Sequence, residues 1–110
     1  MIHPSIILIT GRRGSGKTAF GFLTAEIIKN DCGIKIVTLA HPNPSFLPRD
    51  IKNYEKIEDA PQNSVVVVDE AHLIFNARQP GKRENVNIGK LITEVRQKGQ
   101  TLIFITHNTK

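Results

Sequence analysis

Residues 11–18 read GRRGSGKT, and the apolar run IILI at residues 6–9 comes shortly before them. The stretch fits G-x-x-x-x-G-K-[ST] at every fixed position, and the run has the length of a buried strand. Its glycines let the backbone curl until successive N–H groups point inward at a polyphosphate, at the positive end of a helix that begins near Lys17. We therefore predict a strand, a phosphate-binding loop and a helix, in this order.

Two side chains of this loop have different predicted roles in binding ATP. Lys17 is expected to reach the β- and γ-phosphates, and the Thr18 hydroxyl to ligate Mg²⁺. The predicted nucleotide contacts come from the whole loop and the residue after it, namely Gly11, Arg12, Arg13, Gly14, Ser15, Gly16, Lys17, Thr18 and Ala19. The alternative is a Gly-rich turn without a ligand.

A second motif lies at residues 64–70, which read SVVVVDE. Four valines in a row predict a strand that is buried on both faces. Two carboxylates directly after such a strand suggest a functional role, because charged groups are costly close to a buried core. A Walker B motif supplies one, because Asp69 would hold the Mg²⁺ opposite Thr18 and Glu70 would polarise the water that attacks the γ-phosphate. The alternative is an acidic strand end that starts a surface helix.

Size and composition limit the possible number of domains and the kinds of partner. With 110 residues, of which 39% are hydrophobic, the chain is expected to fold as one ATPase domain over residues 1–110. The net charge of +5 favours nucleic acid or nucleotide phosphate as a partner, although part of this charge belongs to the phosphate loop itself.

The sequence shows no targeting or membrane-spanning segment. The longest apolar runs have four or five residues, and residues 1–4 lack the charged and apolar regions of a signal peptide. The single Cys32 excludes an internal disulfide and fits a reducing compartment. We therefore expect a cytoplasmic protein without a membrane span, in the host cytoplasm if the protein is viral.

Behind the loop, apolar residues recur at helical spacing, at Ala19, Phe20, Leu23 and Ile27. The pattern stops before Gly33, which can take the left-handed conformation at a helix end. A second strand is predicted at residues 34–39. Residues 40–63 hold four of the six prolines and are expected to form mostly loop, with a short helical piece at residues 57–60.

The remaining chain continues to alternate. We predict a short helix at residues 71–76 and a polar stretch at residues 77–85, which is either a solvated loop or a contact with DNA or a neighbouring subunit. A clear amphipathic helix follows, with Ile88, Leu91, Ile92 and Val95 on one face and Gly99 at its end. The last strand is predicted at residues 101–106. This alternation predicts an α/β fold with a parallel sheet, right-handed crossovers and helices on both faces, in three layers.

The last strand is followed by polar residues, and this feature suggests a subclass. A glutamate directly behind the Walker B aspartate, with a later apolar strand that ends in polar residues, resembles the additional-strand, catalytic-glutamate branch of P-loop NTPases, which share a RecA-like core. In that branch a strand lies between the phosphate-loop strand and the Walker B strand, and its end faces the γ-phosphate. The resemblance makes Asn108 or His107 a sensor of that phosphate, with Asn108 favoured because a neutral amide can donate to phosphate and accept from water at any pH. A His-Asn turn is the alternative.

Within this branch, residues 65–109 resemble the FtsK–HerA group of DNA-pumping ATPases, including the genome-packaging ATPases of archaeal viruses and the Zot-like assembly ATPases of filamentous phages. The likeness lies in the short lead into ITGRRGSGKT, the segment DEAHLIFNAR and a helix that ends in Arg96 and runs through Gly99 into the next strand. In the family that strand usually ends in Thr-Gln, and here His107 replaces the Gln.

The resemblance implies an ATP-hydrolysing, homo-oligomeric ring that moves or packages DNA. It makes Arg96 or Arg78 a candidate for an arginine that completes a neighbour's site, where it would neutralise charge on the transferred phosphoryl group; solvation at the surface is the alternative. The group normally adds a strand on the far side of the phosphate-loop strand. We therefore expect a truncated or unusually small member whose first strand is left as an edge.

Three other functional classes compete. Residues 69–72 spell DEAH, a helicase motif, but residues 18–69 leave room for only one strand and a Pro-rich loop where superfamily-two helicases place several strands. A small-molecule kinase also uses a phosphate loop, but it needs a lid or base-binding segment that we do not find in the sequence. A nucleotide-gated binding module would not require Glu70, so the presence of Glu70 favours hydrolysis.

Overall fold

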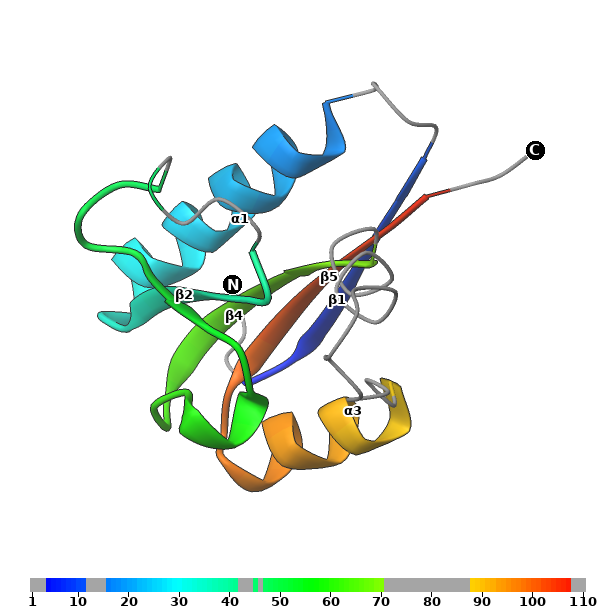
Figure 1. Cartoon of the computed structure of the whole chain (residues 1–110). Helices are drawn as coiled ribbons and strands as arrows, with labels where there is room; N and C mark the ends of the chain where they lie inside the picture. The colour runs from blue at the N-terminus through cyan, green and yellow to red at the C-terminus, as the bar shows by residue number, and fades with distance from the viewer. Residues whose placement is uncertain (1–3, 12–15, 42–44, 46, 71–87, 108–110) are drawn as a thin grey trace.

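The computed structural model describes residues 4–11, 16–41, 45, 47–70 and 88–107, and for Ile88 and His107 the backbone alone. The elements follow one another as β1 (Ile6–Gly11), α1 (Lys17–Cys32), β2 (Lys35–Leu39), β3 (Lys52–Tyr54), the 3-10 turn η2 (Ile57–Asp59), β4 (Ser64–Asp69), α3 (Ile88–Gln97) and β5 (Thr101–His107). Figure 1 shows the strands as one twisted sheet with α1 on one side and α3 on the other. The predicted α/β architecture is confirmed.

The sheet has five strands in the order β1-β5-β4-β2-β3, and all of the pairs are parallel. The strand predicted between the phosphate-loop strand and the Walker B strand is β5. It pairs with β1 from Ile6↔Leu102 to Gly11↔His107 and with β4 up to Asp69↔Ile105. The first strand is the edge of the sheet, as predicted.

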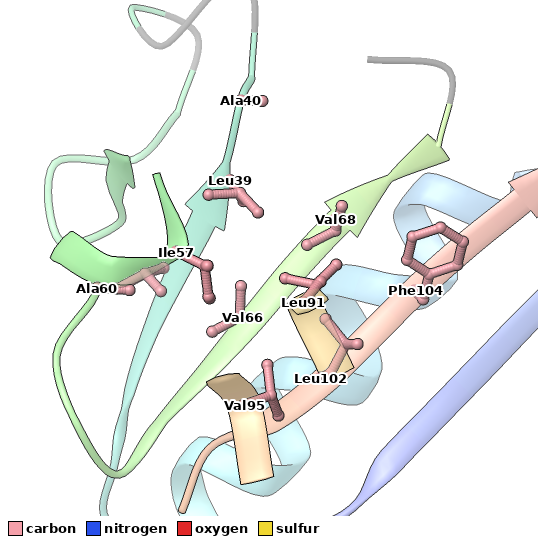
Figure 2. Packing of buried hydrophobic residues seen from close by; sticks show 11 residues of the cluster. Leu39, Ala40, Ile57, Ala60, Val66, Val68, Leu91, Val95, Leu102 and Phe104 are labelled. Atoms are coloured by element: carbon pink, nitrogen blue, oxygen red, sulfur yellow. The ribbon is translucent and has the colours of Figure 1, made fainter. Parts of the chain in front are cut away.

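Two hydrophobic clusters hold the layers together, one on each face of the sheet. The valines of β4 alternate between them, with Val65 and Val67 facing α1 and Val66 and Val68 facing α3. Figure 2 shows the second cluster, in which Leu91 and Val95 of α3 pack against side chains from β4 and β5. Burial on both faces explains the uninterrupted apolar run, because no side chain of the strand faces water.

The long helix α1 exists as predicted, but the face inferred for it is not its buried one. Its spaced apolar residues are exposed, at 58% for Phe20, 58% for Leu23 and 44% for Ile27. The helix instead rests on the sheet through smaller residues and one isoleucine, namely Gly21, Thr24, Ala25 and Ile28. A small-residue face lets the helix approach the sheet closely, and hydrophobic spacing alone could not reveal this.

Gly21 lies where α1 packs closely against the sheet. A Cβ built there would lie 2.9 Å from Ile105 Cδ1 and 3.6 Å from Ile9 Cδ1. We expect Gly21→Val to destabilise the protein by about 1–3 kcal/mol, the usual penalty for overpacking a core. Urea unfolding followed by circular dichroism measures this, with Ala19→Val at an exposed position of the same helix as the control. Equal effects of the two substitutions would show that the contact with Ile105 is unimportant.

The segment between β2 and β4 differs from its prediction. We expected mostly loop over residues 40–63, but residues 52–54 form β3, which pairs with β2 from Val37↔Lys52 to Leu39↔Tyr54. A three-residue strand with the sequence KNY carries no apolar alternation, so the pairing with β2 defines it rather than local pattern. The short helical piece predicted at residues 57–60 is η2.

The two glycines predicted at helix ends take left-handed conformations, with φ of 68° at Gly33 and 64° at Gly99. In the part of the chain that the structure describes, no helix is both long and apolar enough to cross a bilayer.

Candidate functional site

The predicted phosphate loop and Walker B residues meet at one edge of the sheet. Because the strands are parallel, Gly11 at the end of β1, Asp69 at the end of β4 and the backbone of His107 at the end of β5 all lie at the same edge. The amino end of α1 is there too, since only five residues separate Gly11, the end of β1, from Lys17, the first residue of this helix. Open α/β sheets bind their ligands at this edge.

The amino end of α1 is built to receive an anion. Gly16 precedes the helix with φ 80° and ψ 18°, a left-handed conformation in which residues with a side chain are strained. In the first turn of the helix, the N–H of Phe20 donates a hydrogen bond to the Gly16 carbonyl at 3.0 Å. The helix carries no acidic residue in its first turn. Its N–H groups and dipole therefore present partial positive charge that nothing on the first turn neutralises.

Lys17 adds a full positive charge at this position. The residue as a whole is only 6% exposed, and its Nζ donates a hydrogen bond to the carbonyl of Gly11 at 2.8 Å. The ammonium group is thus held across the two ends of the phosphate loop, between the last residue of β1 and the first turn of α1. A buried ammonium is costly without acceptors, and a polyphosphate seated on the loop would supply strong ones.

Thr18 and Asp69, the two predicted Mg²⁺ ligands, face one small cavity. This cavity has a volume of about 10 Å³, room for about one water molecule, and its polar lining comes from Thr18, Asp69, Thr38 and His41. Asp69 is buried, whereas Glu70 directly behind it is half-buried. A hydroxyl and a carboxylate are hard oxygen donors of the kind that Mg²⁺ takes in nucleotide sites, so the residues present fit this ion.

Arg96 lies on the opposite side of the sheet, near the amino ends of the parallel strands. It is exposed in the last turn of α3, just before β5 begins. With Pro4, Ser5 and Gln100 it lines a separate cavity of about 420 Å³ at the amino ends of β1 and β5. The structure therefore does not bring Arg96 together with Lys17 and Asp69 within one subunit.

Ala19, another predicted nucleotide contact, is exposed near the start of α1. The other predicted site residues lie outside the described residues. These are Arg12, Arg13, Gly14, Ser15, Arg78 and Asn108, together with the side chain of His107. The short helix predicted at residues 71–76 and the polar stretch at residues 77–85 also lie outside the described residues.

Two residues of the cavity were not predicted as site residues. Thr38 lies in β2, and His41 lies in the segment predicted to be mostly loop, yet both line the same cavity as Thr18 and Asp69. One signal could have found them, because the residues that follow each strand of a parallel sheet lie at the ligand-binding edge. The predicted end of β2 at Leu39 was enough to apply this rule.

Comparison with known proteins adds a family to this geometry. The family model described as zonular occludens toxin (Zot) matches residues 24–110, from within α1 to the end of the chain. Two proteins named putative ABC transporter ATP-binding protein, from Methanosarcina mazei and Methanosarcina acetivorans, are each 35% identical over 72 residues, or 64% of this chain. The matched region is 14% and 13% of those two proteins, so the chain spans only about a seventh of their length.

Proposed function

The chain belongs to the zonular occludens toxin (Zot) family, and from this premise we propose that it is the ATP-hydrolysing core of a ring-shaped motor that moves or packages DNA. The family, the α/β fold and the related ATP-binding proteins support an ATP-binding P-loop NTPase. The observation that carries the proposal is the meeting of Lys17, Thr18 and Asp69 at the carboxyl edge of the parallel sheet.

In the proposed mechanism, residues of this edge bind ATP before any chemistry takes place. The N–H groups at the amino end of α1 and the ammonium of Lys17 hold the β- and γ-phosphates. Thr18 and Asp69 would hold Mg²⁺, which when bound neutralises charge that develops on the phosphates. Each group is held by a rigid element, either the first turn of α1 or the end of β4.

Glu70 then acts on the water that attacks the γ-phosphate. Its carboxylate accepts a proton from this water, which raises the nucleophilicity of the oxygen. The residue directly follows the buried end of β4 and is half-buried, so it stays accessible to water next to the end of this strand. His107, the last residue of the neighbouring β5, or Asn108, the next residue in the sequence, would read the γ-phosphate.

The position of Arg96 suggests how subunits would meet. Arg96 is exposed at the amino edge of the sheet, whereas the proposed ATP site lies at the carboxyl edge. A head-to-tail contact between these two edges would bring Arg96 of one subunit to the ATP site of the next, and repeated contacts of this kind close into a ring. The charge of +5 suits a DNA substrate.

The test is to measure ATP hydrolysis per subunit across a range of protein concentrations, with and without double-stranded DNA. We expect the rate to rise with concentration, because assembly completes the site, and to rise further with DNA. Arg96→Ala should leave ATP binding unchanged but remove the rise with concentration, while Arg49→Ala, which removes another exposed arginine, should behave like the wild type.

Mixing Arg96→Ala subunits with Glu70→Gln subunits should restore part of the activity, because some interfaces then contain both groups. A rate per subunit that is independent of concentration, of DNA and of Arg96 would contradict the motor. It would point instead to a monomeric nucleotide enzyme such as a small-molecule kinase.

A further inference from the structure

The turn that follows β2 is anchored to the neighbouring strand β3 by several hydrogen bonds. Ala40 has φ 59°, in the left-handed region where a residue with a Cβ is strained. Its N–H donates to the carbonyl of Tyr54 in β3 at 2.7 Å, which anchors the turn to the neighbouring strand. Backbone strain of this kind persists only where the surrounding structure fixes it, and it is concentrated at functional sites.

Asn53 of β3 provides the second anchor. Its Oδ1 accepts hydrogen bonds from the hydroxyl of Thr38 at 2.8 Å and from the N–H of His41 at 2.9 Å, and its Nδ2 donates to the carbonyl of His41 at 3.2 Å. One amide side chain therefore holds the backbone of His41 from both sides. Thr38 is only 2% exposed, so part of this network is shielded from water. Hydrogen bonds in such a low-dielectric environment are stronger than in water.

The held turn forms one wall of the cavity that Thr18 and Asp69 face. Thr38 of β2 and His41, two residues after this strand, line the cavity together with Thr18 at the start of α1 and Asp69 at the end of β4. Mg²⁺ in nucleotide sites keeps several of its waters, so residues around the direct ligands contribute to its binding through those waters. Outer partners of this kind typically change metal affinity by about 10- to 100-fold.

We propose that His41 helps to set the affinity of the site for Mg²⁺, and that Asn53 is the positioning residue that holds His41 in place. This inference rests on the proposed ATP site and adds a third element to it, the turn after β2. It also gives a role to β3, a strand of only three residues that lies beside β2 at the end of the strand order. The strand carries the asparagine that fixes the turn.

The experiment titrates MgCl₂ into the protein with a fluorescent ATP analogue and, in parallel, measures binding of the analogue in EDTA. We expect His41→Ala and Asn53→Ala to raise the Mg²⁺ concentration at half-saturation by about 10- to 100-fold while affinity in EDTA stays unchanged. Asn53→Asp, which retains the oxygen that accepts from Thr38 and His41, should fall between them and the wild type. Asn30→Ala, at an exposed position of α1, is the matched control.

The outcomes separate this inference from the function on which it rests. If the wild type shows no Mg²⁺-dependent binding, both the ATP site and the role of His41 are wrong. If the wild type binds but His41→Ala and Asn53→Ala match it, only the role of the turn is wrong. Equal losses of affinity in EDTA and in Mg²⁺, or an unfolded protein with both alanine substitutions, would overturn it as well, because the turn would then serve stability alone.

Discussion

Lys17→Ala should abolish ATP binding. Lys17 is almost completely buried at the amino end of α1, and its Nζ already lies 2.8 Å from the carbonyl of Gly11, the last residue of β1. A charge-assisted hydrogen bond contributes about 1.5–3 kcal/mol, so losing the expected bonds to two phosphates raises the dissociation constant by about a hundredfold or more. Isothermal titration calorimetry with Mg·ATP measures the change.

Lys29→Ala is the control for this substitution. It removes the same charge from the same helix, but Lys29 lies near the other end and pairs with Asp50 at 3.1 Å rather than with the loop. We expect its affinity for ATP to match that of the wild type. An unchanged dissociation constant in Lys17→Ala, or an equal loss in Lys29→Ala, would show that the loop does not bind phosphate through this ammonium.

Glu70→Gln should separate binding from chemistry. The substitution keeps the size of the side chain but removes the carboxylate that would accept the proton of water. Because this transfer occurs only in the transition state, the affinity for ATP should stay within about twofold while turnover falls by on the order of a hundredfold or more. Calorimetry gives the affinity, and release of inorganic phosphate gives the turnover.

The matched control is Glu26→Gln, since Glu26 is an exposed carboxylate on α1. Its turnover should equal that of the wild type. If Glu70→Gln retains turnover within about threefold of the wild type, the base lies elsewhere. A wild-type chain that binds ATP without measurable turnover would instead favour a nucleotide-gated binding module.

The helices and strands that could be predicted from the sequence are those with a strong burial pattern. The run of four valines in β4 is buried on both faces, and the apolar stripe of α3 packs on the sheet through Leu91 and Val95. In α1 the same reasoning predicted the element but not its orientation. Its buried face is made by Gly21 and other small residues, whose contribution lies in close packing that a hydrophobic pattern does not record.

The candidate site divides in the same way. Lys17, Thr18 and Asp69 stand in motifs of fixed spacing, and motif geometry alone was enough to expect them at one edge. The pair of His41 and Asn53 lies twelve residues apart in a Pro-rich segment and meets only because β3 pairs with β2. The position of Arg96 could not be predicted either. The structure is needed to show that α3 ends near the amino ends of β1 and β5, away from Lys17 and Asp69.

The most direct test of the central claim is the release of inorganic phosphate from ATP by the wild-type chain, measured together with Lys17→Ala and Glu70→Gln. We expect release by the wild type that requires Mg²⁺ and that both substitutions remove, with Glu70→Gln still able to bind ATP. Equal release by all three proteins would contradict an ATPase site built on the phosphate loop and the end of β4.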